Sequence, residues 1–277
     1  MKSLFFLLFA AAVLLAFPFA SAEKAGEPNK SKRAPKTTPP RKSVKPVTTP
    51  PPTPTPIQVG KNLVQNGDFE KKNPKHDSPA NWQLTDGLTS FYEEDDERGM
   101  VVRFDTAVPK EQARERWKVM KAKGVDAPPA PEKGQLKGIY GSIGAFDGIH
   151  YYSDPIPVKK GAHYRLAAYV KGKKPSANYV KIFVKGYGTI TKKRQIRKED
   201  GSVEEKTVTE VRQVFKWYLA CRSVETDWKN FDEWIPCKMR QNVEFVKICL
   251  YPYWPNGEYY FDDICFYEGK EPPTDDD

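Results

Sequence analysis

The chain has 277 residues and a formal net charge of +9, a balance that suggests an anionic partner such as a nucleic acid. The distribution of the charge argues against a nucleic acid, because residues 23–59 contribute +6 and residues 60–277 only +2. The four cysteines include no C-x-x-C pair, which argues against a zinc site or thioredoxin-like redox chemistry.

Residues 1–22 have the pattern of a secretory signal peptide. Lys2 precedes an apolar run, and the small residues 20–22 form a site that signal peptidase accepts. The alternative is an uncleaved membrane anchor, since the run approaches the roughly 20 residues that can span a bilayer. Pro18 breaks the helix beside the cleavage site, so we predict cleavage after Ala22 and a secreted, extracytoplasmic or cell-surface-associated protein.

Residues 23–59 are rich in Pro, Thr and Lys and contain no aromatic residue. Such a segment cannot bury enough apolar surface to offset the entropy lost on ordering, so we predict a disordered linker. Its positive charge suits electrostatic contact with anionic polymers of the cell surface, or simply keeps the spacer solvated and extended.

Residues 60–270 read as one all-β domain, followed by an acidic tail at 271–277. Short runs rich in Val, Ile, Tyr and Phe alternate between apolar and polar residues and are separated by Gly, Pro and Asp-Gly signals. The absence of long intervening helices predicts a two-sheet sandwich. The clearest predicted strands are Met100–Phe104, His163–Val170, Tyr179–Gly186, Val211–Arg222, Phe231–Cys237, Val243–Tyr253 and Glu258–Tyr267.

Two insertions interrupt this series of strands. Pro109–Lys123 has the proline start, basic end and following glycine of a short helix, whose apolar face should pack on the sandwich. Lys192–Glu210 contains the turn signal Asp200-Gly201 and predicts a charged hairpin with Arg197 opposite Glu204. We interpret it as a projecting hairpin bridged by ion pairs, in preference to a basic binding arm.

Four segments in order resemble the β-jelly-roll carbohydrate-binding modules of families four, nine and twenty-two, which belong to the galactose-binding-like superfamily. These segments are Asn62–Glu70 with Trp82, Ser153–Gly172, Thr226–Phe231 and Tyr260–Ile264. Together they cover most of the domain. The resemblance implies a jelly roll whose first and last strands lie together, but the same sandwich also serves functions unrelated to sugars.

The resemblance also implies a structural calcium ion between the first and last strands. Asp262 and Asp263 lie among aromatic residues and should point to opposite faces, and an inward carboxylate needs a partner or a cation. Calcium prefers six to eight oxygen ligands. Carried over by position, these ligands are the carbonyl oxygens of Asp68 and Met100 and the carboxylates of Glu70, Glu97 and Asp262. The alternative is that Glu70 and Asp262 are only hydrogen-bonded.

Sugar binding in this family uses aromatic rings, which offer an apolar face to a pyranose while nearby polar groups bind its hydroxyls. The best candidates are Tyr251, Tyr253 and Trp254, because Pro252 limits regular strand pairing in this aromatic run. Tyr187 and Trp217 follow as companions on neighbouring strands. The further aromatic candidates are Tyr151, Tyr152 and Tyr218.

The cysteines number four and allow three complete pairings. Cys249 and Cys265 are equidistant from the Asn256-Gly257 turn and would face each other in a simple hairpin. A jelly roll often sends consecutive strands to opposite sheets, which would separate them.

No catalytic motif is present, since the sequence contains neither G-x-S-x-G nor H-E-x-x-H and none of its three histidines lies in a recognisable motif. The acidic run Glu93–Glu97 is more typical of a solvated or metal-binding loop than of a glycosidase carboxylate pair. We therefore predict a non-catalytic module that binds polysaccharide or cell-wall glycan. The alternative is a structural or protein-binding module of the cell envelope.

Overall fold

The computed structural model describes residues 60–124, 129–135, 138–173, 180–197 and 201–269. The predicted signal peptide, the linker and the acidic tail lie outside these residues. No helix within the described part of the chain combines the length and the hydrophobicity needed to cross a membrane.

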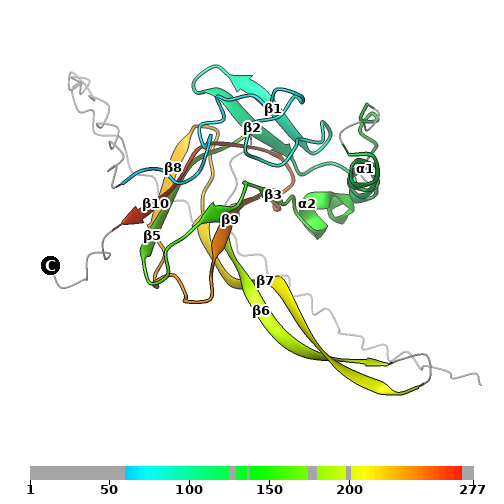
Figure 1. Ribbon diagram of the computed structural model, residues 1–277. Coiled ribbons are helices and arrows are strands. Elements are labelled where there is room, and N and C mark those ends of the chain that lie inside the picture. Colours follow the sequence, from blue (N-terminus) through cyan, green and yellow to red (C-terminus); the bar gives the residue numbers. More distant parts are fainter. Residues whose placement is uncertain (1–59, 125–128, 136–137, 174–179, 198–200, 270–277) are drawn as a thin grey trace, which may run out of the picture. The chain divides into compact units, whose positions relative to one another are not determined.

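Two antiparallel sheets form the domain (Figure 1). The first has the order β1 (Ser90–Asp95), β2 (Gly99–Asp105), β10 (Glu258–Gly269), β5 (His163–Gly172) and β8 (Lys229–Trp234). The second has the order β3 (Tyr151–Tyr152), β9 (Phe245–Tyr251), β6 (Val180–Arg197) and β7 (Val203–Cys221), with β4 (Ile156–Pro157) also paired to β9. The predicted all-β sandwich is confirmed.

The core lies between the sheets because alternate residues of each strand point inward. In β5, Leu166 and Val170 are fully buried, and in β6 Ile182 and Val184 are fully buried as well. These side chains belong to one apolar cluster that contains residues of both sheets. Burying a side chain of this size stabilises the fold by about 1.5–3 kcal/mol.

The opening segment of the domain lies along β10. The Asn62 side chain accepts hydrogen bonds from the backbone N–H of Val64 and Phe266, both at 3.0 Å, and donates to the Ile264 carbonyl at 3.1 Å. A Cβ atom on Gly67 would lie 2.0 Å from the Ile264 oxygen, so only glycine allows this close approach. The first and last segments are therefore neighbours, as the resemblance implies.

The predicted helix is confirmed as α1 (Lys110–Lys123), which follows Pro109 and ends at Gly124 with a positive φ of 64°. Two short helices, η1 (Ile139–Gly141) and α2 (Ile143–Phe146), follow it and were not predicted. Their three to four residues are too few to produce a periodic pattern.

The predicted charged hairpin forms the distal part of β6 and β7, where β6 pairs only with β7 beyond Tyr187 (Figure 1). Ion pairs link its arms, including Lys192–Glu210 at 2.6 Å and Lys193–Glu205 at 2.7 Å. The predicted pairing of Arg197 with Glu204 is wrong by one residue, because Arg197 lies opposite Val203.

The turn explains this error in register. The arms close with Arg197 opposite Val203, which leaves five residues between them, whereas symmetry about Asp200-Gly201 requires an even number. That symmetry therefore misplaces every pair of the hairpin by one residue. At the base of the hairpin a bulge at Val214 restores the predicted register, because Gly186 pairs with Phe215.

All four cysteines are free thiols. Cys249 lies on β9 and Cys265 on β10, and these strands belong to different sheets. Cys249 and Cys265 would lie opposite each other only if β9 and β10 formed a simple hairpin. The chain instead crosses from one sheet to the other between these strands.

Candidate functional site

The second sheet turns one side to the core and the other outward. Ile182 and Val184 of β6 and Ile248 of β9 are fully buried on the core side. The residues that alternate with them point outward and carry an unusual number of rings. We call this outward side the aromatic face; its rings are Tyr152, Phe183, Tyr187, Tyr218, Phe245 and Tyr251.

The rings contact one another across the strands. The Phe183 ring centroid lies 5.4 Å from that of Tyr251 and 5.7 Å from that of Tyr218. Tyr187 stacks on Phe245 at 5.3 Å with nearly parallel planes. Contacts of this kind are worth about 0.5–1.5 kcal/mol beyond burial, so they hold the rings in fixed positions.

Tyr251 is supported by the segment that precedes β3. Its hydroxyl donates to the Asp147 carbonyl at 3.1 Å, and its ring lies 4.6 Å from His150 and 5.2 Å from Tyr253. A Cβ on Gly148 would lie 2.6 Å from the Tyr251 ring, and Gly148 has a positive φ of 67°. Glycine at this position therefore lets the segment pack beneath Tyr251.

The predicted sugar-binding residues divide into three groups. Tyr187 and Tyr251 lie on the aromatic face, and Tyr253 stacks on Tyr251 at its border. Trp254 instead stacks on the exposed ring of Tyr140, at 6.4 Å. Trp217 does not lie on the aromatic face, because it is opposite Val184 and packs against the core.

Several residues of the face were not chosen from the sequence. Phe183 and Phe245 were not among the candidates, and Tyr152 and Tyr218 were named without priority. A signal was available, since Tyr218 alternates with the apolar series Phe215, Trp217 and Leu219 and must therefore point to the other side. The pairing of β6 with β9, which brings the rings together, could not be predicted from the sequence of either strand alone.

A polar group lies among the rings. The Lys185 amine donates to the Tyr152 hydroxyl at 2.6 Å and lies 3.3 Å from His150 Nδ1. It also lies 4.7 Å from the centre of the Tyr152 ring. Lys185 is only 7% exposed, which makes it a rare buried lysine.

Ionisation in this region follows from burial. Desolvation raises the pKa values of Tyr152, Tyr187 and Tyr251 above that of an ordinary phenol, so their hydroxyls stay protonated at neutral pH. Desolvation of the His150 ring, aided by the positive charges of Lys185 and Lys216, lowers its pKa. The face therefore combines protonated phenols, a neutral imidazole and amine donors.

A hollow of about 350 Å³ opens at one end of the face. Tyr152 and Tyr187 line it together with Trp82, Lys247 and Asp154. Rings beside hydroxyl, amine and carboxylate groups can contact both the C–H side and the hydroxyls of a sugar ring.

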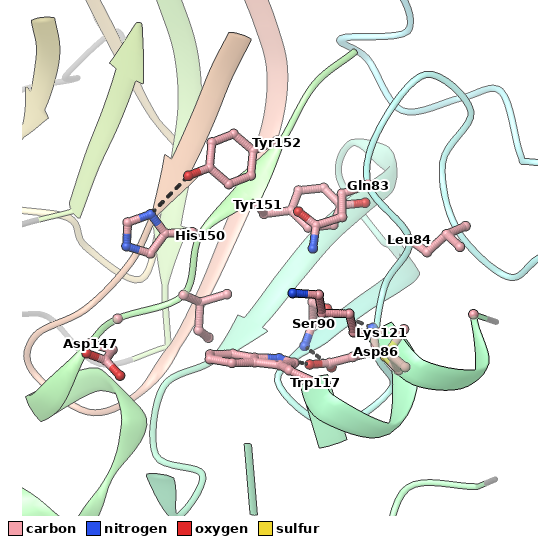
Figure 2. Close-up of a pocket in the computed structure, with 14 residues that line it drawn as sticks. Gln83, Leu84, Asp86, Ser90, Trp117, Lys121, Asp147, His150, Tyr151 and Tyr152 are labelled. Atoms are coloured by element: carbon pink, nitrogen blue, oxygen red, sulfur yellow. Dashed lines mark hydrogen bonds between the residues drawn. The ribbon is translucent and has the colours of Figure 1, made fainter. Parts of the chain in front are cut away.

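A larger cavity, of about 640 Å³, lies between α1 and the sandwich (Figure 2). Trp117 projects from α1 along one side, and His150 and Tyr152 form part of the other side before continuing into the aromatic face. The Tyr151 hydroxyl, which belongs to another lining residue, has no hydrogen-bond partner among the described residues. The insertion thus builds a second concavity next to the face, which was not predicted.

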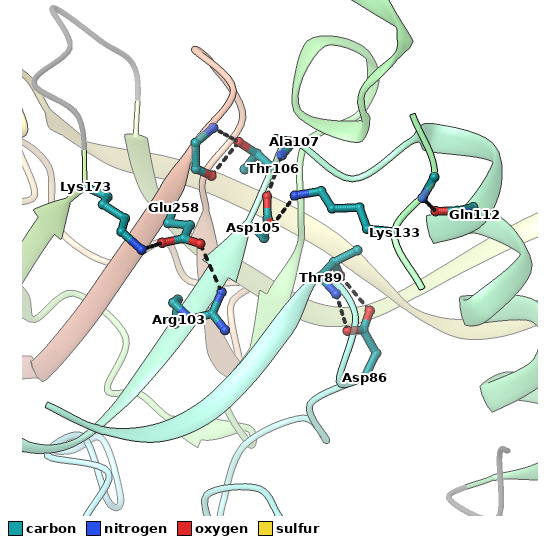
Figure 3. A network of polar contacts seen from close by, with 12 residues as sticks. Asp86, Thr89, Arg103, Asp105, Thr106, Ala107, Gln112, Lys133, Lys173 and Glu258 are labelled. Carbon is teal, nitrogen blue, oxygen red and sulfur yellow. Dashed lines mark hydrogen bonds and ion pairs between the residues drawn. The ribbon is translucent and has the colours of Figure 1, made fainter. Parts of the chain in front are cut away.

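Asp86 fixes α1 against the sandwich. Its carboxylate accepts hydrogen bonds from Trp117 Nε1 at 2.7 Å and from the Thr89 hydroxyl at 2.6 Å, and also from three backbone N–H groups. Figure 3 shows the hydrogen bonds between Asp86 and Thr89. It also shows the ion pair of Lys133 with Asp105, whose nitrogen and oxygen atoms lie 2.5 Å apart. The contacts of Asp86 with Trp117 and Ser90 hold two walls of the larger cavity in place.

Among the predicted calcium ligands, Asp262 forms an ion pair with an arginine. Asp262 is 3% exposed, and its Oδ2 accepts from Arg98 Nε at 2.6 Å. Arg98 also pairs with Asp263, because a bulge after Asp262 and a positive φ of 47° at Asp263 bring both carboxylates to one guanidinium. The expectation that Asp262 and Asp263 point to opposite faces assumed a regular strand without this bulge. The guanidinium further lies over the Tyr169 ring at 3.9 Å.

The remaining predicted ligands do not join Asp262. Glu70 accepts from the backbone N–H of Met100 at 3.0 Å, and Glu97 is exposed. No group of three or more His, Cys, Asp or Glu residues that could hold a metal occurs in the described part of the chain. The five predicted ligands do not form a calcium site around Asp262 in this arrangement. They are the carboxylates of Glu70, Glu97 and Asp262 and the carbonyl oxygens of Asp68 and Met100. The calcium site stays a prediction, and Arg98 supplies the positive charge there.

Comparison with known proteins gave no family assignment. No protein-family model and no curated protein matches the chain. Solved structures that resemble it include the enzymatically active domain of tailspike protein 4 from bacteriophage CBA120, with 11% identity, a TM-score of 0.39, and 75% of this chain but 21% of that chain covered.

Carbohydrate-binding modules are also among the similar structures. A family 16 module has 13% identity, a TM-score of 0.39 and coverage of 75% and 100% of the two chains. A family 4 module has 13% identity, a TM-score of 0.34 and coverage of 74% and 99%. The CBM22-1 xylan-binding domain from Paenibacillus barcinonensis has 12% identity, a TM-score of 0.36 and coverage of 77% and 98%. These structural likenesses assign no ligand to this chain.

Proposed function

We propose that the chain is a non-catalytic module that binds polysaccharide on the aromatic face. The observation that supports this most is the gathering of rings from β3, β6, β7 and β9 on one outward side of the second sheet. A sandwich needs rings in its core, but it does not need six on the opposite side of a sheet.

The chemistry of the face suits a sugar. The rings are fixed by contacts with one another, so little side-chain entropy is lost when a ligand binds. Tyr152, Tyr187 and Tyr251 keep protonated hydroxyls that can donate to sugar oxygens. The hollow between Tyr152 and Tyr187 gives one sugar unit a concave seat.

A glycan array of the full chain tests the proposal when it is repeated with Tyr251→Ala. Truncating an aromatic residue in a binding site often costs about 2 kcal/mol, or about thirtyfold in affinity. Tyr140→Ala is the matched control, because Tyr140 is 76% exposed and lies outside the aromatic face. Equal binding by wild type and Tyr251→Ala, or no binding by the wild type, would refute the proposal.

Export and tethering complete the proposed function. The signal-peptide pattern of residues 1–22 and the Pro/Thr/Lys composition of residues 23–59 support a secreted protein whose linker lets the module reach a surface. Mass spectrometry of the exported protein should find Glu23 at the N-terminus. Intact Met1 in a membrane fraction would indicate an anchor instead.

A further inference from the structure

Three lysines lie in direct register across the aromatic face. Lys185 of β6 is opposite Lys216 of β7 on one side and opposite Lys247 of β9 on the other. We call these residues the lysine row. Like charges directly opposite each other on one face of a sheet destabilise the pairing, so the fold alone does not account for this arrangement.

The central lysine of the row is also buried without an opposite charge. Lys185 is 7% exposed, and its amine has the Tyr152 hydroxyl and His150 Nδ1 as polar partners. Among the described residues, no carboxylate lies within 4.0 Å of the amine of Lys185, Lys216 or Lys247. A buried charge that lacks a counter-charge is unfavourable, and the nearby Tyr152 and Phe183 rings offset only part of this cost.

Basic groups of the first sheet are paired, in contrast to the lysine row. Arg98, Arg103 and Lys171 all form ion pairs with carboxylates there. On the aromatic face, Lys181 adds a fourth amine, 4.7 Å from the centre of the Tyr218 ring. Asp154 is the carboxylate that lines the hollow, and it lies at the Lys247 end of the row. Positive charge therefore gathers on the aromatic face around Lys181, Lys185 and Lys216.

We propose that the ligand of the aromatic face is an acidic polysaccharide, whose anionic groups contact the lysine row while its sugar rings lie on the aromatic side chains. This inference rests on the proposed function and names the class of polysaccharide. Bound carboxylate or sulfate groups would supply the counter-charge that Lys185 lacks, and would remove the repulsion between lysines in register.

The composition of the face favours a saccharide over a single-stranded nucleic acid. Nucleic acids bind such surfaces by stacking successive bases on open ring faces. Here the rings pack on one another, and among them only Tyr218 is an exposed large residue, at 45%, so the face offers one open ring, which is enough for a pyranose but not for a run of stacked bases. Four of the six rings instead carry hydroxyl groups, which suit a ligand rich in oxygen.

The experiment compares polygalacturonate with the same polymer after reduction of its carboxyl groups, using affinity electrophoresis of the full chain. The basic linker is identical in all variants, so a difference in affinity between variants reflects binding at the aromatic face. We expect the wild type to bind polygalacturonate more tightly than the reduced polymer. Lys185→Met should weaken binding about tenfold or more, while its melting temperature stays equal or rises because a buried charge has been removed. A lysine that served only the fold would lower the melting temperature when replaced.

Two further variants complete the design. Lys216→Met removes an exposed charge of the row and should also weaken binding, which keeps the test valid if Lys185→Met fails to fold. Lys229→Met is the matched control, because Lys229 is exposed and lies over the Phe231 ring on the first sheet. Its binding should equal that of the wild type.

Additional probes separate the possible outcomes. Dextran sulfate with uncharged dextran as control shows whether sulfate groups replace carboxylates. If the reduced polymer binds as tightly as polygalacturonate and Tyr251→Ala weakens both, the acidic ligand is refuted and the proposed function stands. If neither Tyr251→Ala nor Lys185→Met changes binding, both are refuted. Equally tight binding of oligothymidylate at the lysine row would overturn the saccharide assignment.

Discussion

His150 links the polar and aromatic parts of the face. Its Nδ1 lies 3.3 Å from the Lys185 amine and 3.4 Å from the Tyr152 hydroxyl, so a neutral imidazole can accept a hydrogen bond where an imidazolium cannot. The titratable or charged groups around it are Lys185, Lys216, Tyr152, Cys249, Tyr251 and Asp147. Of these, Asp147 raises its pKa, but desolvation and the two lysines outweigh it and lower the pKa.

This lowered pKa predicts a pH dependence of stability. The unfolded chain binds the proton of His150 more readily than the folded chain, so stability from this residue is present above the ordinary histidine value of 6.5 and is lost as pH falls below it. His150→Gln retains an acceptor for Lys185 but cannot be protonated. Denaturant midpoints from pH 8 to pH 5 should fall more for the wild type than for His150→Gln. Parallel pH profiles would contradict this.

Arg98 compensates the charge of a nearly fully buried carboxylate, Asp262. Removing one partner of a buried ion pair often costs about 3–5 kcal/mol, so Arg98→Met should lower the melting temperature markedly. The double variant with Asp262→Asn should recover part of that loss, because it removes the orphaned charge. If Arg98 alone supplies the charge, adding calcium to the wild type leaves the melting temperature unchanged. A calcium-dependent rise that Asp262→Ala abolishes would establish the predicted calcium site instead.

The distal ribbon of β6 and β7 is an element whose contacts are almost entirely internal. From Ile190 to Glu210 its strands pair only with each other, and its ion pairs are solvent-exposed to varying degrees. Exposed ion pairs contribute about 0–1 kcal/mol each. Replacing residues 190–210 with Asn-Gly joins two residues that already pair, Thr189 and Val211, through a two-residue turn. Melting temperature and glycan binding should stay close to wild type, whereas failure to fold would assign the ribbon a structural role.

Strand content and the inserted helix could be predicted because alternation and capping are local signals. The faces of the strands were harder to assign. Trp217 was chosen as a ligand contact although Phe215 and Leu219, two residues to either side, mark its side as apolar. The bulge at Asp263 and the odd number of residues between the arms of the ribbon have no sequence signature, and they changed the partner of Asp262 and the register of the ribbon. Pairing of β6 with β9, which assembles the lysine row, depends on the whole fold.

Over the whole molecule, net charge conceals local charge. Residues 60–277 carry only +2, because acidic residues nearly equal basic residues in number there, and on the first sheet Arg98, Arg103 and Lys171 pair with carboxylates. The lysine row therefore becomes apparent only from the register of β6 with β7 and β9. Two regions of positive charge result, the linker with +6 and the aromatic face, and both suit the same class of anionic polymer.

The most direct measurement is an amide NMR titration of the isotope-labelled full chain with an oligogalacturonide. Binding on the aromatic face predicts chemical-shift changes concentrated at Lys181–Tyr187 of β6 and Phe245–Tyr251 of β9, with little change in β5 and β8. Tyr251→Ala should abolish these changes, and Tyr140→Ala should preserve them. Shifts centred on the first sheet, or shifts confined to the linker, would contradict the account.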